Sequence, residues 1–213
     1  MSKGIIIAGT SAEVGKTYIA SLIVTAMNNY GLNTGYYKVS TCGGSQAELS
    51  MFASGVAFAS YLYQTQAAPH IAAMIENRPI EKEQIQIDFF NLQQRYEYLC
   101  VESNGGMMCP LRIDGSTTLM MSDILQEMYL PVVLVSSLVS DKVNHLLLSI
   151  QYARSKHLPL KGVILNRYNP QSAFCKDKLK ELESVLDIPI ICVIEENADI
   201  LPLSKSDLIY LFE

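Results

Sequence analysis

A glycine-rich loop between an apolar strand and a helix constrains this chain more than any other feature. Residues 4–8 read Gly-Ile-Ile-Ile-Ala, a short β-branched run typical of a buried strand. Residues 9–17 read Gly-Thr-Ser-Ala-Glu-Val-Gly-Lys-Thr, and a helical pattern with one apolar face continues to about residue 29. The backbone N–H groups of such a loop and the N-terminus of the following helix attract phosphate. The sequence therefore predicts a nucleotide phosphate loop at residues 9–17.

Two side chains of this loop have predicted roles, although its spacing is unusual. Lys16 would reach the terminal phosphates, and the Thr17 hydroxyl would ligate Mg²⁺. The common pattern has four residues between its first glycine and Gly-Lys-Thr; here Thr10 holds that place and Gly9 lies one residue earlier. The alternative is a strand–turn–helix junction that needs glycine only for its turn. In that case Lys16 and Thr17 would be coincidental, so the sequence favours the phosphate loop.

Length and composition limit the class of protein. With 213 residues, 49% of them hydrophobic and 17% charged, the chain is expected to form one domain over residues 1–213 with a well-buried core. A net charge of −5 and a pI near 5.3 argue against nucleic acid or an anionic membrane as the main partner. The five cysteines form no Cys-x-x-Cys pair, so neither a zinc site nor a disulfide framework is indicated. Without a leader pattern or a long apolar run, we expect a cytoplasmic protein.

Apolar strand patterns alternate with helical patterns along the chain. The predicted strands are residues 4–8, 35–39, 98–102, 131–136, 162–166 and 188–193. The predicted helices are residues 18–29, 82–96, 119–127, 144–155 and 174–186. This alternation predicts an α/β fold with a parallel sheet that helices cover on both faces, as in P-loop NTPases. Ligands bind such sheets at the carboxyl ends of the strands. The expected site therefore combines residues 9–17, 38–45, 102–106, 136–144 and 166–167.

Taken in order, the segments at these strand ends resemble those of dethiobiotin synthetases over nearly the whole chain. The family's loop, Gly-Thr-Asp-Thr-Glu-Val-Gly-Lys-Thr, has the same length and spacing as residues 9–17. Each remaining motif is weak alone, but their order and separation match the family. The matching segments are Tyr37-Lys38-Val39-Ser40-Thr41-Cys42-Gly43, Pro69-His70, Arg78-Pro79-Ile80, Val101-Glu102-Ser103-Asn104-Gly105-Gly106, Pro110-Leu111, residues 130–135, Asn144-His145 and Asn166.

The resemblance implies a homodimeric ligase that depends on ATP and Mg²⁺ and holds its substrate near the dimer interface. Such enzymes join CO₂ to 7,8-diaminononanoate and close the ureido ring of dethiobiotin. An amine carbamate forms first, and its oxygen attacks the γ-phosphoryl group of ATP. The second amine then closes the ring on the carbamic-phosphoric anhydride and expels phosphate.

The matched positions carry the family's roles onto this chain. Lys16 and Lys38 would be catalytic, because positive charge is needed around the phosphoryl group in flight and around the carbamate. Thr17 and Glu102 would ligate Mg²⁺. The expected nucleotide-binding residues are Glu13, Val14, Gly15, Lys16, Thr17 and Asn166, and the expected substrate-binding residues are Lys38, Cys42 and Asn144.

Departures from the family gather on the substrate side. Cys42 replaces a substrate-contacting serine, and Gln46 stands where the family has an Mg²⁺-binding aspartate, with Glu48 as a possible substitute. Val39 replaces a proline, Ser103-Asn104 replaces Gly-Ala, and the family's carboxylate-facing tyrosine has no clear counterpart beside Phe174 and Lys178.

The most informative departure is Ser140-Asp141, which replaces a Leu-Gly pair at the start of the helix that would receive the substrate carboxylate. Asp141 is either an N-cap that stabilises this helix or a charge that repels the substrate carboxylate.

Three hypotheses follow: a dethiobiotin synthetase with an altered substrate pocket, a paralogue with ATP chemistry on another amine or carboxylate, and a nucleotide-binding protein without ligase activity. The third resembles the partition and division-site ATPases, which carry a second lysine near the start of the loop. Thr10, Ser11 and Ala12 supply none, which counts against that hypothesis.

Overall fold

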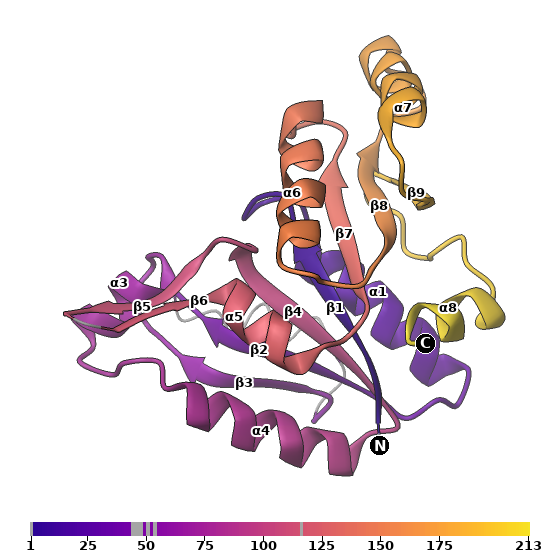
Figure 1. Ribbon diagram of the computed structural model, residues 1–213. Helices are drawn as coiled ribbons and strands as arrows, with labels where there is room; N and C mark the ends of the chain where they lie inside the picture. Colours follow the sequence, from indigo (N-terminus) through magenta and orange to yellow (C-terminus); the bar gives the residue numbers. More distant parts are fainter. Residues whose placement is uncertain (1, 44–48, 50–51, 53–54, 116) are drawn as a thin grey trace.

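A parallel sheet forms the centre of the computed structural model, which describes residues 2–43, 49, 52, 55–115 and 117–213. Within these residues seven parallel strands lie in the order β3-β2-β4-β1-β7-β8-β9, and a two-stranded antiparallel pair, β5-β6, lies beside them (Figure 1). The strands are β1 (Lys3–Gly9), β2 (Thr34–Thr41), β3 (Ala57–Leu62), β4 (Tyr98–Gly106), β5 (Pro110–Asp114), β6 (Thr117–Met120), β7 (Val132–Ser137), β8 (Leu160–Tyr168) and β9 (Ile190–Glu195).

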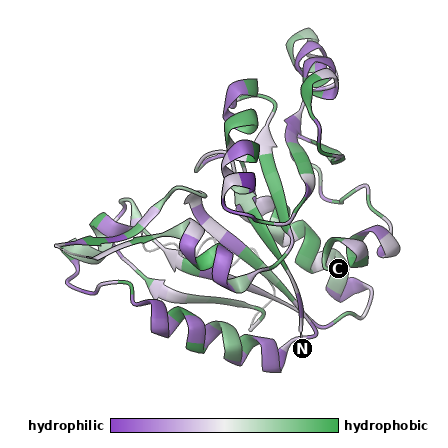
Figure 2. Ribbon diagram, in the orientation of Figure 1, coloured by the Kyte–Doolittle hydropathy of each residue, from purple (hydrophilic) through white to green (hydrophobic). Residues whose placement is uncertain are grey.

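Helices cover both faces of the sheet, as the sequence predicts. They are α1 (Lys16–Asn29), α3 (Pro69–Ile75), α4 (Lys82–Arg95), α5 (Met121–Met128), α6 (Val143–Ser155), α7 (Ala173–Val185) and α8 (Lys205–Leu211). Side chains alternate along each strand, so Ile5 and Ile7 of β1 pack against the α1 and α8 face, whereas Ile6 and Ala8 pack against the face of α4 to α7. Figure 2 shows mostly hydrophobic residues along the central strands β1, β7 and β8 and a mixture of hydrophilic and hydrophobic residues along the outer helix α4. The predicted fold class is confirmed.

The strand order places β1 in the middle, with β4 and β2 on one side of it and β7 and β8 on the other. All these strands run parallel, so their carboxyl ends meet at one edge of the sheet. The phosphate loop leaves β1 at this edge and turns directly into α1. Every polar segment that the sequence places in the site therefore starts from the same edge.

Several elements differ from the sequence prediction. The helix predicted over residues 119–127 begins two residues later, at Met121, because Leu119 and Met120 form the end of β6. The Asp123 carboxylate accepts a hydrogen bond from the Met120 N–H at 2.9 Å, which sets the start of α5 at Met121. The edge strand β3 was missed because Ala57–Leu62 contains no β-branched residue. The short helices α3 and α8 show too little periodicity to be predicted as amphipathic.

In the part of the chain that the structure describes, every helix is too short or too polar to cross a membrane. The cytoplasmic location stays a prediction.

Candidate active site

A cavity of about 520 Å³ opens where β1, β2 and β4 end. Its walls come from the phosphate loop, from the end of β2 and from β4, which are segments far apart in the sequence. The predicted site residues that line it are Glu13, Lys16, Thr17, Lys38, Cys42 and Glu102. The strand order explains this meeting, because β4 lies between β1 and β2 and pairs with both. The structure thus brings most of the predicted residues together.

The start of the phosphate loop explains its unusual spacing. The Lys16 ammonium donates hydrogen bonds to the carbonyl oxygens of Ser11 (2.8 Å) and Ala12 (2.9 Å), and the lysine is only 3% exposed. A Cβ atom on residue 9 would lie 2.8 Å from Lys16 Cδ and 2.7 Å from the Ser11 carbonyl oxygen. Only glycine fits beneath the lysine at this position. Gly9 therefore lets the backbone lie close to the Lys16 side chain, a role that the usual pattern gives to a glycine one residue later.

Asn166, at the end of β8, supports the loop from behind. Its side chain is buried, and its amide donates a hydrogen bond to the Val14 carbonyl oxygen at 2.9 Å. Gly15 adopts a left-handed conformation with φ of +93°, and a Cβ there would lie 2.2 Å from the Asn166 amide nitrogen. Val14, Gly15 and Asn166 thus form one packed unit next to α1. Their nucleotide-binding roles stay predictions.

Gly15→Ala is expected to cost more stability than Gly31→Ala. Both residues have positive φ, but the Cβ of residue 31 would meet nothing within 4 Å. Gly31→Ala therefore reports the left-handed backbone alone, about 1–2 kcal/mol, whereas Gly15→Ala adds the collision with Asn166. Urea unfolding measures the free energy of unfolding that each variant loses. Equal losses would show that the collision with Asn166 costs no stability.

The Glu102 carboxylate is the polar centre of the cavity. One oxygen accepts hydrogen bonds from the Thr17 hydroxyl (3.0 Å) and the Lys38 ammonium (3.0 Å), and the other accepts from the Tyr36 hydroxyl (2.7 Å). Glu102 is 1% exposed, and Lys38 lies opposite it in the β2–β4 register. This buried ion pair is satisfied by charge and by hydrogen bonds, as buried charges require.

The contact between Tyr36 and Glu102 was not predicted from the sequence. Strand alternation places Tyr36 and Lys38 on the same face of β2, two residues apart. A tyrosine that precedes a functional lysine by two residues in a strand is the signal that could have identified it.

Thr17 and Glu102 suit Mg²⁺. Their hydroxyl and carboxylate oxygens are 3.0 Å apart, and adjacent oxygens around octahedral Mg²⁺ with bonds of about 2.0–2.1 Å lie about 2.9 Å apart. Both are hard oxygen donors, and two protein ligands completed by phosphate and water are usual for this ion. The residues present therefore fit the ion. Gln46 and Glu48, considered as further ligands, lie outside the described residues.

Two thiols and an amide line the wall of the cavity where the sequence predicts the substrate. Burial raises the pKa of Cys109 to about 11, although the Lys16 ammonium opposes this shift, so the thiol stays protonated at neutral pH. Cys42 lies in the same wall, at the end of β2. The Asn104 side chain accepts a hydrogen bond from the Ser40 N–H (3.2 Å) and donates one to its carbonyl oxygen (2.6 Å). The departure at residue 104 therefore joins the ends of β2 and β4.

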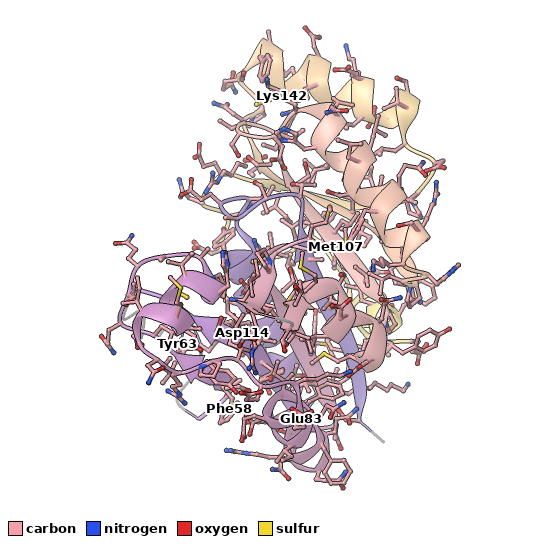
Figure 3. All side chains as sticks on the ribbon, turned by 60° about the vertical axis from the view of Figure 1, so that its left-hand side comes forward. Phe58, Tyr63, Glu83, Met107, Asp114 and Lys142 are labelled. Atoms are coloured by element: carbon pink, nitrogen blue, oxygen red, sulfur yellow. The ribbon has the colours of Figure 1, made fainter. Side chains whose placement is uncertain are left out.

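Asn144 lies away from this cavity. It is exposed on α6 and lines a second cavity of about 470 Å³ between α6 and α7, together with Lys142, Phe174 and Lys178. Figure 3 shows Lys142 on the α6 and α7 side of the molecule, whereas Tyr63 and Phe58 lie on the β3 side. Within one chain, Asn144 and the other predicted substrate residues do not share a cavity.

The N-cap interpretation of Asp141 was wrong. Lys142 is the N-cap residue of α6, and no side chain caps this helix. The Asp141 carboxylate instead accepts hydrogen bonds from the hydroxyls of Thr10 and Ser136 and from the Ser137 N–H. It points toward the phosphate loop because these donors surround it there. The sequence shows an aspartate before a helix but not the direction of its side chain.

Comparison with known proteins places this site in a family. A family model described as an AAA domain matches residues 3–203. An ATP-dependent dethiobiotin synthetase from Brachyspira hyodysenteriae is 32% identical over 223 aligned residues that cover 100% of both chains. An enzyme of the same name from Clostridium perfringens is 33% identical over 213 residues, covering 92% of this chain and 93% of the relative.

Solved structures with low sequence identity share the fold. A plasmid partition protein from Borrelia burgdorferi has a TM-score of 0.64 at 15% identity and covers 100% of this chain and 98% of its own. Cobyrinic acid a,c-diamide synthase from Mycobacterium smegmatis, solved with an ATP analog and magnesium, has a TM-score of 0.59 at 12% identity and covers 100% and 91%. These likenesses show the α/β architecture alone. The full-length relatives show more: the chain belongs to the family of ATP-dependent dethiobiotin synthetases.

Proposed function

We propose that this protein is an ATP- and Mg²⁺-dependent cyclo-ligase that forms the ureido ring of dethiobiotin from CO₂ and 7,8-diaminononanoate. One observation carries the proposal: the phosphate-loop lysine, a second lysine and a Thr–Glu oxygen pair line a single cavity. Full-length relatives named ATP-dependent dethiobiotin synthetase support the same chemistry.

The reaction needs positive charge at two places, and the two lysines supply it. In the proposed sequence a substrate amine and CO₂ form a carbamate, whose oxygen attacks the γ-phosphoryl group of ATP. Lys16 exchanges its loop carbonyls for phosphate oxygens and stabilises the charge that develops there. Lys38 of β2 forms an ion pair with Glu102 of β4 and faces the same cavity, where it stabilises the anionic carbamate. Ring closure by the second amine then releases phosphate.

Thr17 and Glu102 would hold Mg²⁺, which neutralises phosphate charge when bound. Glu13, on the loop side of the cavity, would position substrate or metal, and Cys42 would contact the substrate from the end of β2. Because Lys38 already contacts the Glu102 carboxylate, the metal site and the carbamate site are adjacent. A shared carboxylate of this kind keeps the reacting groups within one small volume.

Product analysis tests the proposal. The purified protein is incubated with ATP, Mg²⁺, 7,8-diaminononanoate and ¹³C-bicarbonate, and the product is followed by mass spectrometry together with released phosphate. Dethiobiotin carrying one ¹³C atom, formed in step with phosphate, is the expected result. ATP binding without any ureido product would contradict it.

A second candidate function is supported by the altered substrate side. Cys42, and Asn104 with its bonds to Ser40, change the surface where the substrate would lie, while the nucleotide side is intact. These features suit a paralogue that transfers phosphate from ATP to another amine-derived or carboxylate acceptor. Phosphate release stimulated by such an acceptor, and not by diaminononanoate, would favour this candidate.

We also predict that the protein is a homodimer. Large apolar side chains are exposed near α6 and α7, among them Val139, Leu148 and Phe174, and a second copy of the chain would cover them. The family resemblance implies a substrate near such an interface, which would bring Asn144 of one chain to the other chain's cavity. Sedimentation velocity at micromolar concentration measures the state, and a fully active monomer would contradict the prediction.

A further inference from the structure

We propose that Asp141 is the positioning residue of the phosphate loop, holding residues 9–11 in the form that binds nucleotide. The proposal deepens the proposed function and depends only on its nucleotide-binding part. Asp141 lies in the turn between β7 and α6, more than a hundred residues after the loop in the sequence. It is nevertheless buried against the loop, with 5% of the residue exposed.

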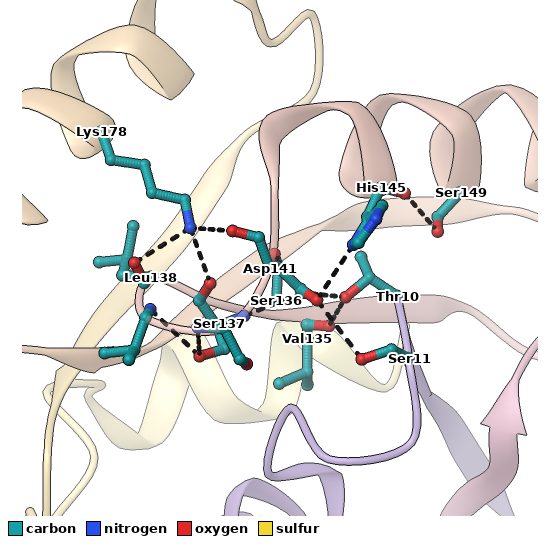
Figure 4. A network of polar contacts seen from close by, with 12 residues as sticks. Thr10, Ser11, Val135, Ser136, Ser137, Leu138, Asp141, His145, Ser149 and Lys178 are labelled. Carbon is teal, nitrogen blue, oxygen red and sulfur yellow. Dashed lines mark hydrogen bonds and ion pairs between the residues drawn. The ribbon is translucent and has the colours of Figure 1, made fainter.

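The contacts of the Asp141 carboxylate join two segments (Figure 4). On the β7 side, one carboxylate oxygen accepts hydrogen bonds from the Ser136 hydroxyl (2.9 Å) and the Ser137 N–H (3.1 Å). On the loop side, the same oxygen accepts a hydrogen bond from the Thr10 hydroxyl, and the other oxygen accepts a longer one from the Ser11 hydroxyl (3.4 Å). Hydrogen bonds to a buried carboxylate are stronger than those between neutral groups.

Asp141 contacts Thr10 and Ser11, and the second of these residues also contacts Lys16. Ser11 and Ala12 present their carbonyl oxygens to the Lys16 ammonium, at 2.8 and 2.9 Å. Thr10 is fixed further by its N–H, which donates to the Val135 carbonyl oxygen at 3.2 Å. A change at Asp141 therefore reaches Lys16 most directly through Ser11. Asp141 lines the second cavity, between α6 and α7, but not the cavity that contains Lys16, so its effect there is on the placement of the loop.

A buried lysine fixes Asp141 from the opposite side. The Lys178 ammonium, from α7, donates hydrogen bonds to the carbonyl oxygens of Ser137 (3.3 Å), Leu138 (3.0 Å) and Asp141. Burial lowers the pKa of Lys178, and the charge of Asp141 opposes that shift. The main chain of Asp141 is thus held by α7 while its side chain holds the loop. Because α7 binds the main chain of the turn and the phosphate loop binds the Asp141 side chain, the turn fixes the position of the loop relative to α7.

His145 completes the surroundings of the carboxylate. Its Nδ1 lies 3.6 Å from the Asp141 oxygen that Ser11 contacts, and its side chain is partly exposed on α6. Thr10 and His145 also line a small cavity of about 230 Å³ on the far side of the loop start. Apart from His145 and the bonds named above, the described structure gives the carboxylate no further polar partner.

Nucleotide affinity tests the positioning role. Asp141→Ala removes the carboxylate that accepts from the Ser136 hydroxyl and leaves the Thr10 hydroxyl only its longer contact with the Val135 carbonyl oxygen (3.4 Å). The Kd for a non-hydrolysable Mg·ATP analogue should therefore rise about tenfold, equivalent to about 1.4 kcal/mol. Asp141→Asn keeps an acceptor oxygen and should restore part of the affinity. Asp177→Asn is the matched control, because Asp177 is an exposed carboxylate on the adjoining helix α7. Titration calorimetry well below the unfolding temperature measures all three.

A double-variant cycle separates positioning from general stabilisation. Thr10→Val removes the hydroxyl that Asp141 holds and keeps the branched shape. If Asp141 acts through Thr10, the double variant binds the analogue no more weakly than Asp141→Ala alone. Should Asp141→Ala not fold, Thr10→Val carries the test with the same expected direction.

The opposing outcomes are distinct. A lowered unfolding temperature with an unchanged Kd in Asp141→Ala, or an unchanged Kd in Thr10→Val, would overturn the positioning role and leave the proposed function intact. A parent protein that binds nucleotide but makes no dethiobiotin would overturn the proposed function alone. A parent protein that binds no nucleotide would overturn both.

Discussion

Lys16→Ala is expected to lower the ATP-dependent rate by about 10²–10⁴, because the variant lacks the ammonium that we propose stabilises charge on the transferred phosphoryl group. The fold should survive, since the polar contacts of the Lys16 ammonium include the carbonyl oxygens of its own loop, at Ser11 and Ala12. Steady-state phosphate release with diaminononanoate and bicarbonate measures the rate. Urea unfolding of the same preparation shows that the fold is retained.

Lys180→Ala is the control for this variant. Lys180 is an exposed lysine on α7, and its replacement changes the net charge equally without touching the loop. Its rate should equal that of the parent. A folded Lys16→Ala protein with the parent's rate would contradict the assignment of Lys16 to the phosphates.

Glu102→Gln is expected to raise the Mg²⁺ concentration needed for half-maximal rate and to lower the maximal rate. Glutamine keeps the shape of the side chain but removes the charge that faces Lys38 and the proposed Mg²⁺ site. Because one partner of a buried ion pair is lost, the free energy of unfolding should also fall, by up to about 3–5 kcal/mol. Metal titration of the rate and denaturant unfolding measure the two effects separately.

Lys38→Met distinguishes these two effects. In the double variant with Glu102→Gln, no unpaired charge is left in the cavity wall, so stability should recover in part. Activity should not recover, because the double variant lacks both the proposed metal ligand and the lysine proposed to face the carbamate. A metal titration of Glu102→Gln that superimposes on that of the parent would remove Glu102 from the metal site.

The sheet and its reacting edge could be predicted because the information for them is local. Near-continuous apolar runs identify buried parallel strands, and polar residues that follow such strands must meet at one edge. Lys16, Lys38 and Glu102 were identified in this way and line one cavity. The same reasoning failed for β3, whose residues lack β-branching, and for the hairpin β5-β6, whose pairing depends on a turn and not on periodicity.

The supports of the loop could not be predicted because they depend on side-chain direction. Asp141 precedes a helix and reads as a cap, but the Thr10 and Ser136 hydroxyls draw its carboxylate away from the helix. Asn166 lies near the carboxyl end of β8, at the expected edge, but its amide contacts the Val14 carbonyl oxygen behind the loop. A single sequence does not show which of several nearby partners a polar side chain selects.

Because β1 lies in the middle of the sheet, the residues with different roles in the site come from the two halves of the sheet on either side of it. The residues proposed to face the substrate come from β2 (Lys38) and from the segment directly after it (Cys42), whereas the supports of the loop, Asn166 and Asp141, come from β8 and from the turn after β7. The two groups share no strand. Mutations that change the acceptor pocket can therefore accumulate in one half of the sheet without disturbing the residues of the other half that support the phosphate loop. A fold divided in this way can acquire new acceptors by gradual change while it stays an ATP-using enzyme throughout.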